Sequence, residues 1–98
     1  MKVRHYCTSS NRDIILDFLE KCSSDIKEDY FDAIAQLEGG KILEMPLSRN
    51  LFNICLGLHE LRLKNRSGQV RFFYYVKKKT GIFVLHAFKK KEGRAVQK

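Results

Sequence analysis

Arg62 and Arg71 are the two side chains of this 98-residue chain whose spacing best suits a phosphate site. Each lies in a segment where polar and apolar residues alternate, which is the pattern of a β-strand with one covered face. Residues 65–68, Asn-Arg-Ser-Gly, supply turn chemistry between the two segments, so we expect neighbouring antiparallel strands. Guanidinium groups that converge on a sheet face recognise phosphate through paired hydrogen bonds.

Aromatic side chains accompany these arginines. Lys64 follows Arg62 at a spacing of two, and Phe73 and Tyr75 follow Arg71 in the same way. Residues two apart in a strand share a face, so we expect all five on the side turned away from the helices. Cations interleaved with rings suit a phosphate and a stacked base, which predicts an RNA-binding surface.

One lysine run precedes the last predicted strand and a second run follows it. We interpret residues 77–79 as a solvated hairpin turn. Lys89, Lys90 and Lys91 follow directly from an apolar strand, so their positions should be fixed beside the sheet face. We therefore expect them to contact the same ligand.

Other enzyme signatures are missing from the sequence. It contains no glycine-rich phosphate loop and no nucleophile elbow. The three histidines stand without ligands at metal-binding spacing, so we expect no metal and no cofactor. Residues 82–88 form a near-continuous apolar run, typical of a strand covered on both faces, and we interpret His86 within it as a core histidine.

Positive charge is concentrated in the second half of the chain. The net charge is +8, with −2 in residues 1–50 and +10 in residues 51–98. Such a distribution points to a polyanionic partner, either nucleic acid or an acidic membrane surface. The interleaved aromatic residues favour RNA, and we expect no membrane partner.

Cysteine usage and hydropathy favour a cytoplasmic protein. The three cysteines lack CxxC spacing, and Cys22 and Cys55 fall on apolar-periodic positions, so we expect reduced thiols, with a disulfide as the alternative. No signal peptide is evident, and no apolar run approaches the roughly 20 residues that span a bilayer.

The elements that must position these residues are two helices and four strands. Residues 2–8 alternate as a first strand, after which Ser9 and Ser10 are expected to cap a helix. Residues 23–25 separate it from a second amphipathic helix, with Phe31 on its apolar stripe, that ends at Gly39-Gly40. Residues 41–53 are interpreted as an irregular connector. The order β-α-α-β-β-β predicts one α+β domain over residues 1–98, a two-helix hairpin packed on a mainly antiparallel sheet.

The same segments resemble the RelE/ParE superfamily of toxin–antitoxin toxins, and within it the phage-derived HigB-like branch. Three segments in register carry the resemblance: Gly57-Leu-His-Glu-Leu-Arg62, Gly68-x-x-Arg71-Phe-Phe-Tyr74 and Val84-Leu-His-Ala-Phe-Lys-Lys90. The resemblance implies a RelE-like microbial RNase fold. It also implies a ribosome-dependent, metal-independent endoribonuclease that cuts mRNA in the A site through attack by the RNA's own 2′-hydroxyl.

Three catalytic residues follow from the resemblance: Arg62, Arg71 and Lys90. It further implies a cognate antitoxin, a helix-turn-helix protein, with oligomers formed only through the antitoxin complex. Several members carry a tyrosine or a histidine near the C-terminus, and residues 94–98 contain neither. Either Tyr75 or His86 takes that part, or the chain is a weakly active or inactive relative. The alternatives are a ParE-like gyrase inhibitor and a plain nucleic-acid binder on the same fold.

Overall fold

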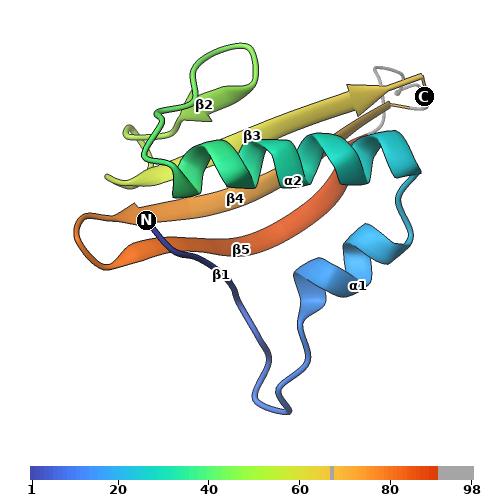
Figure 1. Cartoon of the computed structure of the whole chain (residues 1–98), viewed down its shortest axis with the longest axis horizontal. Coiled ribbons are helices and arrows are strands. Elements are labelled where there is room, and N and C mark those ends of the chain that lie inside the picture. The colour runs from blue at the N-terminus through green and yellow to red at the C-terminus, as the bar shows by residue number, and fades with distance from the viewer. Residues whose placement is uncertain (67, 91–98) are drawn as a thin grey trace.

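A computed structural model describes residues 1–66 and 68–90, and Figure 1 shows two helices on a five-stranded sheet. In chain order the elements are β1 (Val3–His5), α1 (Ile14–Glu20), α2 (Ser24–Glu38), β2 (Ser48–Asn50), β3 (Leu58–Asn65), β4 (Gly68–Lys77) and β5 (Gly81–Lys90). The strands lie in the order β1-β5-β4-β3-β2, antiparallel except for the parallel pair β1–β5. The predicted α+β class and element order are confirmed.

One strand, β2, lies within the segment that we expected to be an irregular connector. Its three residues pair with β3, with Arg49 opposite Glu60. The buried Ser48 hydroxyl also lies 2.6 Å from the hydroxyl of Tyr74, which fixes this edge strand to the sheet. Three residues are too few for the alternation by which a strand is recognised in sequence.

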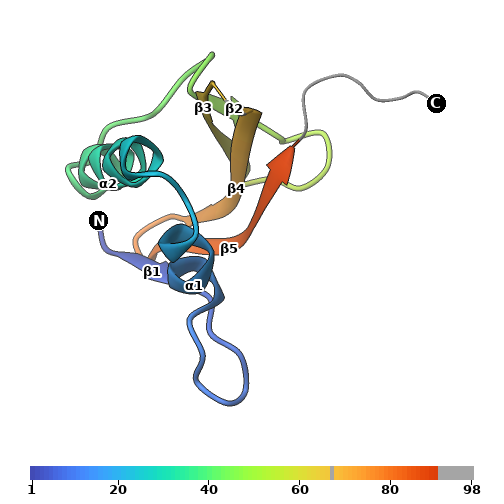
Figure 2. The same cartoon turned by 90° about the vertical axis from the view of Figure 1, so that its right-hand side faces the viewer.

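Both helices cover the same side of the twisted sheet (Figure 2), with α1 over β5 and α2 over β3. Alternation along β3 and β4 places Leu61, Leu63, Phe72 and Tyr74 on this side, where all four are buried. In α2, however, Phe31 is half exposed and does not join the core as predicted, and Ala33 is buried instead. No helix among the described residues is long and apolar enough to cross a membrane.

The first helix begins later than predicted. Its N-cap is Asp13, whose Oδ1 accepts a hydrogen bond from the Leu16 N–H at 2.9 Å, so Ser9 and Ser10 do not cap it. Asp13 Oδ2 lies 2.9 Å from His5 Nδ1, and His5 Nε2 lies 2.7 Å from the buried Tyr30 hydroxyl. The ionised Asp13 carboxylate can only accept, so His5 Nδ1–H donates to it. This chain of hydrogen bonds joins β1, α1 and α2.

Replacing Asp13 with alanine should lower the free energy of unfolding by about 1–2 kcal/mol, as for other lost N-caps. Partial burial raises the pKa of Asp13, but hydrogen bonds from Leu16 and His5 outweigh it, so the pKa lies below its ordinary value. A carboxyl with a lowered folded pKa stabilises the fold above its unfolded pKa of about 3.9, and this contribution is lost on further acidification. Urea unfolding should therefore show that the variant and the parent differ less in free energy of unfolding at pH 3 than at pH 7. An equal difference at both values would contradict this role.

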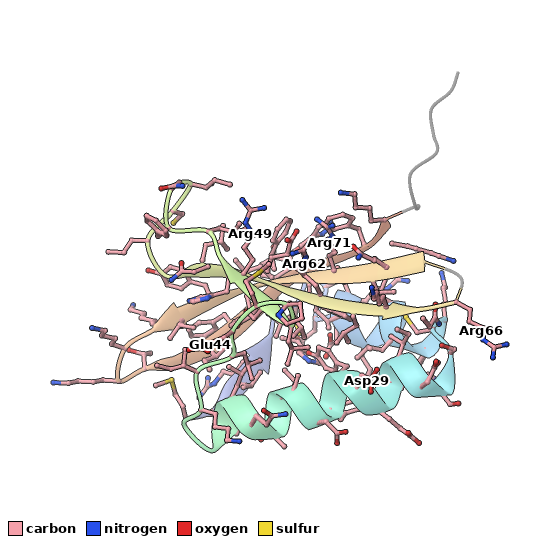
Figure 3. All side chains as sticks on the ribbon, turned by 90° about the horizontal axis from the view of Figure 1, so that it is seen from above. Asp29, Glu44, Arg49, Arg62, Arg66 and Arg71 are labelled. Carbon is pink, nitrogen blue, oxygen red and sulfur yellow. The ribbon has the colours of Figure 1, made fainter. Side chains whose placement is uncertain are left out.

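Among the described residues, no helix covers the opposite side of the sheet, which we call the open face (Figure 3). On β5, the prediction of two covered faces is wrong beyond Val84, because Leu85 and His86 are exposed. The β4–β5 register also shifts at Leu85, so that His86 pairs with Phe73 and Val84 with Tyr74. This bulge turns His86 to the open face, and the interpretation of His86 as a core histidine is wrong.

Candidate nucleic-acid interface

Arg62 and Arg71 occupy directly opposite positions on β3 and β4. Both side chains lie on the open face, above the sheet in Figure 3, while α2 lies below it. The predicted convergence of the two guanidinium groups is therefore present. Their side chains are only 23% and 12% exposed, so each is held against the sheet rather than extended into solvent.

Glu60 lies between the two arginines and accepts a hydrogen bond from Arg71. Its carboxylate is 7% exposed, with Oε2 3.2 Å from Arg71 Nη1 and Oε1 3.8 Å from Arg62 Nε. Gln69 Oε1 accepts hydrogen bonds from Arg71 Nε and Nη2 at 3.3 and 2.9 Å. Two positive groups share one buried negative partner, which leaves net positive charge at the surface. These hydrogen bonds hold the Arg71 guanidinium in place, so an anion that binds it meets a preorganised group, whereas the buried Arg62 Nε has no hydrogen-bond partner among the described residues.

An aromatic cluster adjoins the arginines on the same face. Phe73 stacks on His86 with ring centroids 6.4 Å apart, and Phe88 lies 5.6 Å from Phe73 and 5.9 Å from His86. Phe88 is also the β5 partner of Arg71. A guanidinium beside clustered rings provides the two contacts that a single-stranded nucleotide needs, one for its phosphate and one for its base.

Other cations surround this centre. Arg49 on β2 pairs with Glu60, and Lys90 on β5 pairs with Gln69, so both share the open face. Lys64 is exposed two residues beyond Arg62 and borders, with Arg62 and Gln69, an open cavity of about 280 Å³. We call the set Arg49, Arg62, Lys64, Arg71, Phe73, His86, Phe88 and Lys90 the basic interface.

Two of the predicted lysines are not placed with this set. Lys89 lies within β5 and pairs with Val70, so it faces the helix side and borders a cavity with Phe18 and Cys22. The expectation that Lys89 joins the ligand surface is therefore wrong. Lys91 lies outside the described residues, as do residues 94–98.

Tyr75 is on the open face as predicted, but at the end remote from the turn between β3 and β4. Its ring packs over Gly57, where an added Cβ would lie 2.9 Å from a Tyr75 ring carbon. His59, by contrast, lies on the helix side, stacked on Tyr74 with centroids 5.1 Å apart, and burial lowers its pKa. His59 is thus no part of the basic interface.

Acidic residues limit the interface on one side. Asp29 and Asp32 on α2 border an open cavity of about 360 Å³ whose other wall includes Arg62 and Lys64. Figure 3 shows Asp29 on the helix side of the sheet. Carboxylates repel phosphate, so this border is unfavourable to a polyanion.

One known protein family matches most of this chain. The model of the phage-derived Gp49-like protein family (DUF891) matches residues 17–98. The chain belongs to this family. The Gp49-like family lies within the RelE toxin–antitoxin superfamily. Searches of the curated proteins and of the solved structures found no significant match.

In this Gp49-like chain the sequence-based prediction gave no role to Glu60, Arg49 or Phe88. Alternation does place Glu60 on the face of Arg62, since it precedes that residue at a spacing of two. Arg49 gave no signal, since β2 is too short to show alternation. Among the described residues no group of three or more histidines, cysteines or acids could hold a metal ion. The three cysteines are free, and Cys55 is exposed in a loop, contrary to the apolar position that we expected.

Proposed function

We propose that this Gp49-like chain is the toxin of a toxin–antitoxin system, of the HigB-like type, and that it cleaves translated mRNA on the ribosome. The observation that supports this best is the pairing of Arg62 with Arg71 beside an aromatic cluster on an open sheet face. A single-stranded nucleotide could place its phosphate on the arginines and its base on the rings.

Cleavage would proceed by transfer of the phosphodiester to the neighbouring 2′-oxygen. The 2′-oxygen attacks phosphorus, its proton passes to a base, the bond to the 5′-oxygen breaks and that oxygen takes up a proton. The products are a 2′,3′-cyclic phosphate and a 5′-hydroxyl end. Arg62, Arg71 and Lys90 would stabilise the added negative charge of the phosphorane. Such electrostatic stabilisation is usually the largest contribution to the rate.

His86 is the residue that we infer to move the proton. It is exposed on the open face and stacks on Phe73, two pairs along the strands from Arg71 and Phe88. An imidazole changes its protonation state near neutral pH, as proton transfer in both directions requires. Glu60 would position the two guanidinium groups, because each of its oxygens faces one of them.

The partners in this proposal are mRNA, the ribosome and a cognate antitoxin of the helix-turn-helix type. We expect oligomers only through the antitoxin complex. A ribosome-bound mRNA is presented in a fixed conformation, which suits a small open face that lacks a deep cleft of its own.

Expression of the chain alone should arrest growth, and primer extension on transcripts from arrested cells should map cuts within translated codons. The same transcripts with a mutated start codon should stay intact, because they do not enter the ribosome. Growth arrest with intact transcripts and inhibited gyrase would instead support a ParE-like toxin. RNA binding without cleavage or arrest would support a plain nucleic-acid binder.

Affinity of the purified chain for single-stranded RNA should fall steeply with salt. Each phosphate contacted on a single strand contributes about −0.7 to the slope of log K against log salt concentration. Contacts from Arg62, Arg71 and Lys90 therefore predict a slope near −2, measured by filter binding or fluorescence anisotropy. A slope near zero would contradict the basic interface as the RNA site.

A further inference from the structure

A cavity lies beyond the C-terminal end of α2, on the helix side of the sheet. Figure 1 shows β3 and β4 continuing past this end of the helix, where α2 no longer covers them. The cavity has a volume of about 270 Å³. Six of the residues that line it carry the argument: Leu37, Leu43, His59, Tyr74, Val76 and Ile82. We call it the end cavity.

The way in which α2 ends explains why the end cavity is left open. The Lys41 N–H donates to the Gln36 carbonyl at 3.0 Å, which closes the last turn. Gly40 has a φ of 91°, a left-handed conformation that turns the chain away from the helix axis. Of the next residues, Leu43 is buried, whereas Ile42 is 83% exposed. One buried leucine therefore stands where a further helical turn would fill the space.

His59 is a polar group at the end cavity that lacks a partner. Its ring stacks on Tyr74 with centroids 5.1 Å apart, and its nitrogens have no hydrogen-bond partner among the described residues. The Tyr74 hydroxyl, by contrast, is already paired with that of Ser48 at 2.6 Å. In the described part of the chain only Arg62 Nε is both buried and unpaired, so the His59 nitrogens are accessible. Burial lowers the pKa of His59, which keeps the imidazole neutral at pH 7, with one nitrogen able to accept a hydrogen bond.

Size and lining restrict what could occupy the end cavity. Leu37, Leu43 and Ile82 are buried at its wall, and Val76 is partly buried. An apolar cavity of about 150 Å³ holds one benzene ring. The end cavity, at about 270 Å³, therefore has room for two fused rings.

Charge at the end cavity favours a neutral occupant. The cavity lies at the negative end of the α2 dipole, which disfavours an anion. Lys41 borders it but is exposed, and the Met1 amino group already donates to the Glu38 carbonyl at 2.6 Å, so neither provides a fixed, unpaired positive charge. None of the described residues that line the cavity is acidic, so a cation would find no opposite charge.

We propose that the end cavity binds a small neutral aromatic molecule that donates one hydrogen bond, from a ring N–H or a phenolic O–H, to the imidazole of His59. The apolar walls would cover the rings, and the imidazole would orient the single polar group, as is usual in ligand pockets. The site is separate from the basic interface, because Arg62 and Arg71 project from the same strands to the opposite side (Figure 3). The inference therefore does not rest on the proposed function.

The probe is indole, which consists of two fused rings with one N–H. Titration into the isotope-labelled full chain should shift the methyl NMR signals of Leu37, Leu43, Val76 and Ile82 until they saturate, with a dissociation constant of about 1 mM or tighter. Indene has the same two rings without the N–H. It should bind about tenfold more weakly, because it leaves the imidazole without a partner.

Two variants and a matched control separate the parts of the site. His59→Phe keeps a flat ring beside Tyr74 and removes both nitrogens, so indole and indene should bind it equally. Val76→Phe fills the cavity and should bind neither probe. Leu85→Phe enlarges an exposed apolar residue of β5 outside the cavity and should bind both probes as the parent does.

Absence of saturable shifts in the parent, or equal affinity of the parent for indole and indene, would overturn the inference. Both results come from the parent chain, so they do not depend on the folding of a variant. Backbone amide shifts confined to Phe73, His86 and Phe88 would also overturn it, because they would assign the probe to the basic interface. Failure of the chain to bind or cut RNA would contradict the proposed function without affecting the indole result.

Discussion

Replacing Arg71 with alanine is expected to lower the rate of RNA cleavage by a factor of about 100 to 1,000, the usual effect of removing one preorganised donor from a charged transition state. Arg71 lies opposite Arg62 and next to Phe88, at the centre of the basic interface. Single-turnover cleavage on programmed ribosomes would measure the loss. Unchanged cleavage would show that the reacting phosphate binds elsewhere.

The same substitution should also cost some stability, because Glu60 would keep only Arg62, 3.8 Å away, as an ionic partner. A buried group that loses its partner typically costs about 1–3 kcal/mol. The double variant Arg71→Ala/Glu60→Gln removes the stranded charge and should recover part of the lost melting temperature without recovering cleavage. Arg66→Ala, at the exposed turn between β3 and β4, is the matched control and should change neither quantity. If the double variant regained cleavage, the loss in Arg71→Ala would be due to unfolding.

Phe72→Ala should be the most destabilising change, lowering the free energy of unfolding by about 3–5 kcal/mol, as for other buried aromatic residues. Phe72 is fully buried, 5.8 Å from Phe18 and 4.6 Å from Tyr30 between ring centroids, so it joins the sheet to both helices. A domain of this size is stable by only about 5–15 kcal/mol, so the variant should be partly unfolded at 37 °C. Urea unfolding at lower temperature would measure the change.

Phe73→Ala is the control on the neighbouring residue, which faces the other way. It should cost little stability, because the ring is partly exposed and lies beside the surface rings of His86 and Phe88. It should weaken binding of single-stranded RNA about tenfold or more, since a stacked base contributes about 1–3 kcal/mol. Similar losses of stability in both variants would contradict the assignment of the two faces.

Strand alternation was sufficient to predict the centre of the interface. A period of two along residues 58–65 requires that Arg62 and Lys64 lie on one face of their strand. The same period along residues 68–77 requires that Arg71, Phe73 and Tyr75 lie on one face of theirs. The apolar residues between them must face the helices, which places both sets on the open side. The turn at residues 65–68 then makes the two strands antiparallel neighbours. The fold class followed from the same local patterns and the element order.

Local pattern could not predict which residues of β5 reach the interface. Ile82 and Val84 are buried, and an unbroken period of two would bury His86 and Lys90 as well. The bulge at Leu85 reverses the faces of all later residues, which exposes His86 and Lys90 on the open side and turns Lys89 toward α1. A bulge depends on the partner strand, so the register with β4 decides it.

The sequence by itself determined that this chain folds as two helices on a mainly antiparallel sheet, with two arginines and aromatic residues on the uncovered face, because these features depend on periodicity and turn residues. Only the tertiary structure decided that Glu60 bonds to Arg71 across the strand pair, that His86 joins the arginines, and that Asp13 rather than Ser10 caps the first helix. The first two depend on the pairing of β4 with its neighbouring strands, and Asp13 also binds His5, which in turn contacts Tyr30. Local propensity does not include such contacts.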